Sequence, residues 1–118
     1  MRMLVLVSAC LLLAACDSTP PNQVKDDPSY SADIQPIFNA SCVACHSGSS
    51  PNGNYNLSSR AGALGTGTDS TPNVIGSAAS VSLLFLRLDA GTMPPADRLD
   101  TVDIYNVRNW IDQGAKDN

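Results

Sequence analysis

The apolar positions of this chain recur at helical spacing in three segments, which polar loops separate. The first segment begins near Tyr30, where Asp33 is the expected N-cap and Pro36 falls in the first turn. Its apolar stripe follows the i, i+3, i+4 pattern and contains Ile34, Ile37, Phe38, Ser41, Cys42 and Cys45. We therefore expect one helix that presents its apolar side chains and both thiols on a single face.

The second apolar segment covers residues 81–88 and is rich in leucine. As a helix, it would be apolar on nearly every side. Ser80 is the expected N-cap and Gly91 the expected stop, so we predict a helix packed within the core. An apolar run this short is also compatible with a buried strand, which is the alternative interpretation. Arg87 is the one charged residue of the run; it either reaches solvent at the end of the helix or pairs with an acidic group of a cofactor.

The third segment begins at Asp100 or Thr101, where Asp100 and Asp103 together resemble a capping box, and it ends at Gly114. Three residues at helical spacing form its inner stripe: Ile104, Val107 and Ile111. We expect Trp110 to pack against the first helix.

The residues between 47 and 80 are rich in Gly, Ser, Asn and Thr, so most of this stretch is expected to be loop. Ser58 to Leu64 is a candidate short helix that Gly62 interrupts. A loop this long in a small domain usually encloses a ligand or serves a function. The predicted fold class is all-α, with three to four short helices and long Gly/Ser-rich loops.

The start of the chain resembles a secretory signal peptide over residues 1–15, with Arg2, an apolar stretch, and small residues before Cys16. Leu13-Ala14-Ala15-Cys16 also resembles a bacterial lipobox, which implies that Cys16 carries lipid; a secreted protein with a free thiol is the alternative. Residues 16–29 are rich in Pro, Asp and Ser, so they predict a flexible tether that reaches about 40 Å at roughly 3.3 Å per residue. Residues 30–118 form the predicted domain, on the periplasmic side of the bacterial cell envelope.

The chain has a formal net charge of −4, and all of its 11 acidic residues are aspartates. An acidic surface argues against nucleic acid as a partner and is compatible with basic redox proteins, although solubility alone also explains it.

Cys42-Val43-Ala44-Cys45-His46 is a C-x-x-C-H run, the attachment signature of c-type haem. The two thiols would bond the porphyrin, and His46, the only histidine in the chain, would bind the iron. We expect the second ring N–H of His46 to donate to a carbonyl between Gly48 and Gly53, with Pro51 favoured. The alternatives are a redox-active dithiol or disulfide and a zinc site, although zinc needs about four Cys or His ligands.

Met93 is the only methionine outside the signal peptide, and two prolines follow it. Because no second histidine exists, the sixth iron ligand is Met93, water or a weaker group. Prolines restrict the backbone, which suits a ligand that must stay in place. The alternative is that Met93 only fills the core.

Taken together, the chain resembles the class I c-type cytochromes. The resemblance rests on Asp33-Ile34-Gln35-Pro36-Ile37-Phe38, Gly53 to Leu57, Met93-Pro94-Pro95, and Trp110-Ile111-Asp112-Gln113-Gly114-Ala115, and it covers nearly all of Tyr30 to Ala115. It implies a cytochrome c-like domain around one covalently bound haem c, a Met-Pro-Pro ligand loop, and electron transfer rather than enzymatic turnover.

We therefore expect a membrane-tethered monohaem cytochrome c that exchanges single electrons with an oxidase, reductase or dehydrogenase. Two strong axial ligands leave no open position on the iron, which disfavours catalysis. Two alternatives keep the haem: a ligand sensor in which Met93 is displaced, and a small peroxidase, for which the sequence supplies no second histidine and no glutamate.

Overall fold

The computed structural model describes residues 22–118, so the predicted signal peptide and Cys16 lie outside the described residues. Four α-helices carry this part of the chain: α1 (Gln35–Ser41), α2 (Arg60–Ala63), α3 (Leu83–Asp89) and α4 (Thr101–Asp112). No strand occurs within residues 22–118, where Thr66 and Pro72 form a single isolated bridge. The all-α prediction is confirmed. Among these residues, no helix has the length and apolar character needed to span a bilayer.

The first helical segment begins at Tyr30, as the sequence predicts, but its N-cap differs from the expected one. A π-helical turn over Tyr30–Ile34 precedes α1, and Ser29 is its N-cap, with its hydroxyl accepting a hydrogen bond from the Ala32 amide. Asp33 is therefore not the N-cap. Its carboxylate instead accepts from the Ser29 amide at 2.8 Å, which satisfies a donor that the helix end leaves without a partner.

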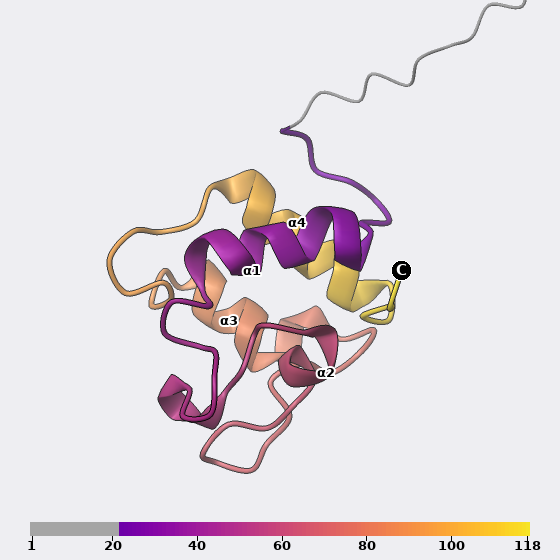
Figure 1. Cartoon of the computed structure of the whole chain (residues 1–118). Helices are drawn as coiled ribbons and strands as arrows, with labels where there is room; N and C mark the ends of the chain where they lie inside the picture. The colour runs from indigo at the N-terminus through magenta and orange to yellow at the C-terminus, as the bar shows by residue number, and fades with distance from the viewer. Residues whose placement is uncertain (1–21) are drawn as a thin grey trace, which may run out of the picture.

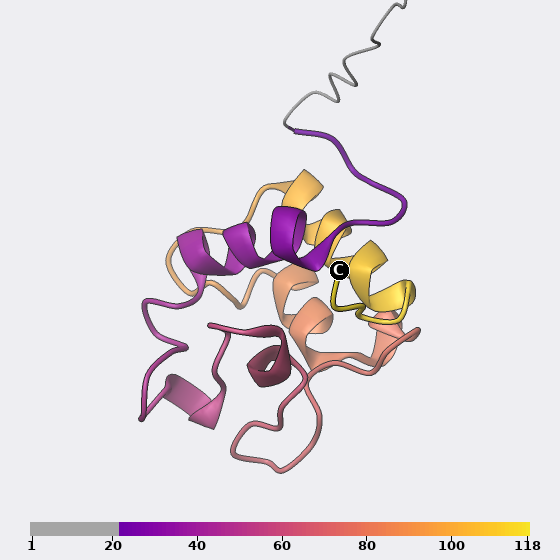
Figure 2. The same cartoon turned by 45° about the vertical axis from the view of Figure 1, so that its right-hand side comes forward.

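The last helix meets the first across an aromatic cluster. Trp110 is fully buried, and its ring centroid lies 5.3 Å from that of Tyr30 and 6.3 Å from that of Phe38. Each aromatic pair of this kind is worth about 0.5–1.5 kcal/mol beyond its buried area. Figures 1 and 2 both show α1 and the turn before it lying across α4. The predicted packing of Trp110 against the first helix is confirmed.

The ends of α4 also match the sequence pattern. The carboxylate of Asp100 accepts from the Val102 amide at 2.8 Å, so Asp100 is the N-cap. The helix gives way to Gln113 and then to Gly114, whose φ of 100° is in the region that favours glycine. The three residues of the predicted inner stripe are all buried: Ile104, Val107 and Ile111.

The second predicted helix begins later than its sequence indicates. Ala79–Val81 forms a separate 3₁₀ turn that contains Ser80, and α3 starts after Ser82. The hydroxyl of Ser82 is fully buried and accepts from the Ile75 amide at 2.8 Å. The expectation that this segment packs on all sides is also wrong, because Val81 and Leu86 are 59% and 43% exposed. Only one face of α3 enters the core.

Most of the chain between α1 and α3 is loop, as expected. Its one α-helix is α2, which Ser59 caps by accepting from the Gly62 amide. The guanidinium of Arg60 reaches the C-terminal segment and donates to the Ala115 carbonyl at 2.7 Å. This contact ties the loop region to the end of α4.

Residues 23–29, predicted as part of a flexible tether, instead form a strap across α4. The side chain of Asn106, which is buried, accepts from the Lys25 amide at 2.8 Å and donates to the Gln23 carbonyl at 3.2 Å. Asn109 donates to the Lys25 carbonyl at 2.7 Å, and Pro28 is fully buried. The prediction is wrong here because two amide side chains more than 80 positions away satisfy the backbone of the strap.

Candidate functional site

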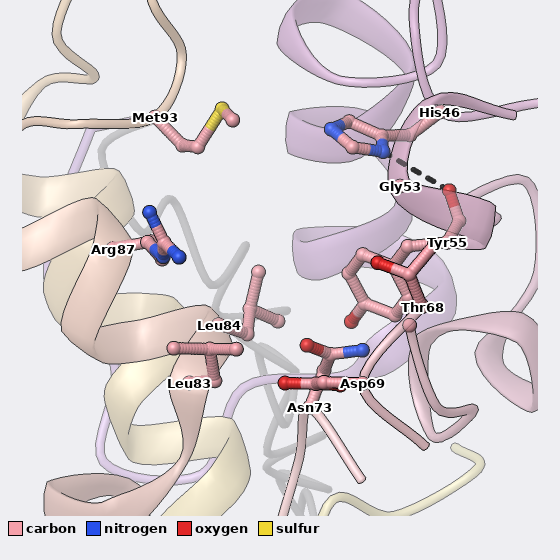
Figure 3. Close-up of a pocket in the computed structure, with 11 residues that line it drawn as sticks. His46, Gly53, Tyr55, Thr68, Asp69, Asn73, Leu83, Leu84, Arg87 and Met93 are labelled. Atoms are coloured by element: carbon pink, nitrogen blue, oxygen red, sulfur yellow. Dashed lines mark hydrogen bonds between the residues drawn. The ribbon is translucent and has the colours of Figure 1, made fainter. Parts of the chain in front are cut away.

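His46 faces a cavity, and its orientation is fixed from behind. Its Nδ1 lies 3.0 Å from the carbonyl oxygen of Tyr55. A carbonyl can only accept, so Nδ1 carries a proton, and the lone pair of the neutral ring is then on Nε2. Figure 3 shows the ring of His46 turned toward the cavity while this hydrogen bond holds its other side. His46 is therefore prepared to bind a metal ion through Nε2.

The carbonyl partner differs from the predicted one. The sequence favours Pro51, but the Pro51 carbonyl accepts from the Asn54 amide at 3.0 Å and closes the 3₁₀ turn at Asn52–Asn54. The chain then brings Tyr55 behind the His46 ring, and the two rings meet edge to face with centroids 5.9 Å apart. Tyr55 is the only aromatic residue between positions 47 and 80, which is the one sequence signal that could have indicated it.

The two cysteines of the C-x-x-C-H run lie in the turns that follow the end of α1. The Cys42 amide donates to the Phe38 carbonyl, and the amides of Cys45 and His46 both donate to the Cys42 carbonyl, at 3.2 and 2.9 Å. Cys42 is buried but Cys45 is exposed, so the prediction that both thiols share the buried face is wrong for Cys45. The reason is that α1 ends at Ser41, before the helical spacing reaches Cys45.

Both cysteines are free thiols, so the structure does not show the alternative disulfide. Burial raises the pKa of the Cys42 thiol from 9.0 to about 11, because the thiolate would lose its hydration. The zinc alternative would need about four ligands. Residues 22–118 bring together no group of three or more His, Cys, Asp or Glu side chains that could hold a metal ion.

Met93 lies on the loop after α3, on the opposite side of the cavity from His46. The amides of Thr92 and Met93 both donate to the Arg87 carbonyl, at 3.1 and 3.2 Å, and the Thr92 hydroxyl donates to the same oxygen. This anchors the backbone of the loop to the end of α3. Met93 is 37% exposed and lines the cavity, so the other side chains of the protein do not enclose it. Figure 3 shows its thioether and the His46 imidazole on facing walls.

The space between them has two lobes that share His46, Gly53 and Met93. The larger lobe has about 770 Å³ of empty volume, part of it open to solvent, and α3 and the 67–73 loop form its far wall. The smaller lobe has about 590 Å³. Six further residues line the smaller lobe: Ser41, Cys42, Cys45, Asn52, Pro94 and Pro95. Sites of this volume accommodate organic cofactors.

The residues around this cavity fit haem c. Two thiols line one lobe, an imidazole nitrogen and a thioether sulfur face each other across the middle, and Leu83 and Leu84 supply apolar wall. An imidazole and a thioether are the axial donors of cytochrome c iron. All four predicted site residues outside the signal region, Cys42, Cys45, His46 and Met93, thus line one connected space. The sequence did not indicate Asp69 or Asn73, which line the larger lobe from the loop.

Comparison with known proteins agrees with this geometry. No curated protein and no solved structure matches the chain significantly. Residues 42–97 match the family described as Planctomycete cytochrome C. The matched region begins at the first cysteine of the C-x-x-C-H run and ends just beyond the Met93-Pro94-Pro95 loop. This chain therefore contains a cytochrome c-like, haem-binding module.

Proposed function

We propose that the chain is a monohaem cytochrome c that carries single electrons between redox proteins on the periplasmic side of a bacterial membrane. One observation supports this most directly: His46 and Met93 face each other across a cavity with Cys42 and Cys45 at one end. The match to the Planctomycete cytochrome C family points the same way.

In this proposal, Cys42 and Cys45 would hold the haem through thioether bonds, and His46 and Met93 would bind its iron. Haem c supplies a reversible one-electron change at its iron when it is bound. The Tyr55 carbonyl holds the His46 ring in one orientation and keeps the proton on Nδ1. The Arg87 carbonyl holds the backbone of the Met93 loop. Because His46 and Met93 would both bind the iron and leave it no free position, we propose a carrier and not an enzyme.

The first test of the proposal is the absorption spectrum of the full chain, produced with haem-attachment machinery. We expect a pyridine haemochrome of the c type, pigment that acidified acetone does not extract, and a thioether–iron charge-transfer band in the oxidised protein. These outcomes follow from two thioether bonds and His/Met ligation. Colourless protein, or pigment that washes out, would contradict the proposal.

A ligand sensor is the second candidate, and the position of Met93 on a loop, outside any helix, is the observation that favours it. A thioether on a loop can leave the iron with less rearrangement of the backbone than one within a helix. Carbon monoxide distinguishes the two functions. An electron carrier in the reduced state should bind it slowly at neutral pH, whereas rapid binding by the unaltered protein would favour the sensor.

We also propose that lipid on Cys16 attaches the domain to the membrane, so that its partners are membrane or periplasmic redox proteins. The basis is the lipobox-like Leu13-Ala14-Ala15-Cys16 sequence. When the full chain is produced in a bacterial host, we expect radioactive palmitate to label it. We also expect the protein to sediment with the membrane fraction. Cys16→Ser should abolish both the label and the membrane association, while a Ser18→Ala control keeps them. An unlabelled wild-type protein would rule out the anchor.

A further inference from the structure

The larger lobe of the cavity carries one positive and one negative side chain, and they come from opposite walls. Arg87 projects from α3 on the same side as Met93, and Asp69 belongs to the 67–73 loop across the space (Figure 3). Among residues 22–118, Arg87 is the only cationic residue that lines either lobe. The smaller lobe, where the two cysteines lie, is lined by neither Asp nor Arg.

The guanidinium of Arg87 has no protein partner within residues 22–118. The other three arginines of this region have acceptors: Arg60 donates to the Ala115 carbonyl, Arg98 to the Asp89 carbonyl, and Arg108 lies 3.6 Å from the Asp112 carboxylate. Among the ion pairs and side-chain hydrogen bonds of residues 22–118, none involves the Arg87 guanidinium. Arg87 is exposed to solvent and also lines the cavity, so its charge and unused donors are available to a group bound there.

The chemistry of haem determines which of its groups can meet this arginine. The vinyl-derived carbons that bond cysteine lie on one side of the porphyrin, and the two propionates lie on the other. Cys42 and Cys45 line the smaller lobe, so a haem attached to them directs its propionates toward the larger lobe. Guanidinium groups bind carboxylates through charge-assisted, often bidentate, hydrogen bonds.

The charge on the opposite wall of the larger lobe also favours the α3 side. The carboxylate of Asp69 repels a second carboxylate placed near it. The charges of Asp69 and Arg87 thus direct a propionate toward α3 and away from the loop.

We propose that Arg87 binds a haem propionate and that its charge raises the reduction potential of the iron. The proposal rests on the proposed function and adds an anion-binding residue to that site. A positive charge near the haem disfavours the ferric state, which carries one more positive charge than the ferrous state. The Arg87 carbonyl, not its side chain, anchors the Met93 loop, so the side chain can be changed while this anchor remains.

The test is the midpoint potential of haem-loaded full-length variants, measured by spectroelectrochemistry. Arg87→Gln should shift the redox equilibrium about tenfold toward the oxidised form, which for a one-electron couple is about 59 mV. Asp69→Asn should shift it in the opposite direction. Arg87→Lys keeps the charge and should retain most of the wild-type potential. Arg108→Gln is the matched control, because it removes the same charge from a residue that lines neither lobe, and it should leave the potential within about threefold.

An Arg87→Gln protein that retains covalent haem but has the same potential as Arg108→Gln would overturn this inference and leave the cytochrome function intact. Failure of the wild type to acquire haem would instead overturn the function itself. If Arg87→Gln does not mature, Asp69→Asn reports on the same cavity from the other wall. An unchanged potential in Asp69→Asn would then overturn the inference.

Discussion

Replacement of both Cys42 and Cys45 by alanine should abolish covalent haem attachment in the full chain. Both residues are free thiols that line one lobe of the cavity, and the other two cysteines of the chain, Cys10 and Cys16, lie outside the described residues. Thioether formation needs a thiol, so no residue of this lobe can replace them. We expect haem stain on a denaturing gel to fall by at least about tenfold.

Single variants show how much each of the two cysteines contributes to haem attachment. Cys45 is exposed, so Cys45→Ala removes one bond with little change in packing. Cys42→Ala also removes a buried side chain from the core. Either single variant should retain some covalent pigment through its remaining thiol. Ser41→Ala is the matched control, because Ser41 lines the same lobe, and it should stain like the wild type. Full staining of the double variant would contradict the assignment of these cysteines.

The second large effect is expected for Met93→Leu, which preserves side-chain volume but removes the sulfur. The backbone of the loop is anchored through the amides of Thr92 and Met93, so the substitution should not displace the loop. The oxidised protein should lose its thioether–iron charge-transfer band. The reduced protein should bind carbon monoxide at least about tenfold faster, because the sixth position on the iron would no longer have a strong ligand.

Two further variants separate ligation from packing. Met93→His supplies a different strong ligand, so it should exclude carbon monoxide again and lower the midpoint potential, since thioether ligation raises the potential relative to two histidines. Leu86→Ala removes an exposed apolar residue of α3 that lines neither lobe, and it should behave like the wild type. A charge-transfer band that survives in Met93→Leu would exclude Met93 as the ligand.

The sequence predicted the features of this protein that depend on local spacing. The C-x-x-C-H run, the Asp100 cap and the buried stripe of α4 each involve residues within about one or two helical turns of each other. Trp110 was also placed correctly, because a large aromatic residue next to such a stripe has few other places to pack. The family match over residues 42–97 contains the C-x-x-C-H run and ends before Asp100 and α4.

Two kinds of feature were not predicted from the sequence. Some depend on contacts between positions far apart in the chain, and others depend on which of several neighbouring residues takes a given hydrogen bond. Pro51 was a plausible partner for His46, but a local turn uses its carbonyl and leaves Tyr55 in its place. Aspartate is a common residue type at the N-cap position, so Asp33 was expected there. Because the π-helical turn begins at Tyr30, the N-cap is Ser29 instead. The polar composition of residues 23–29 is typical of disorder, and only the amides of Asn106 and Asn109 show why the strap is ordered.

The strap changes how far the domain can travel if Cys16 is anchored. Its hydrogen bonds to α4 begin at Gln23, so at most residues 17–22 remain as a leash between the anchor and the folded part. Six residues extend about 20 Å at roughly 3.3 Å each, about half of what a free segment up to Ser29 would allow. An electron-accepting protein would then have to approach close to the bilayer, and encounters would be confined to a shallow layer above the lipid headgroups.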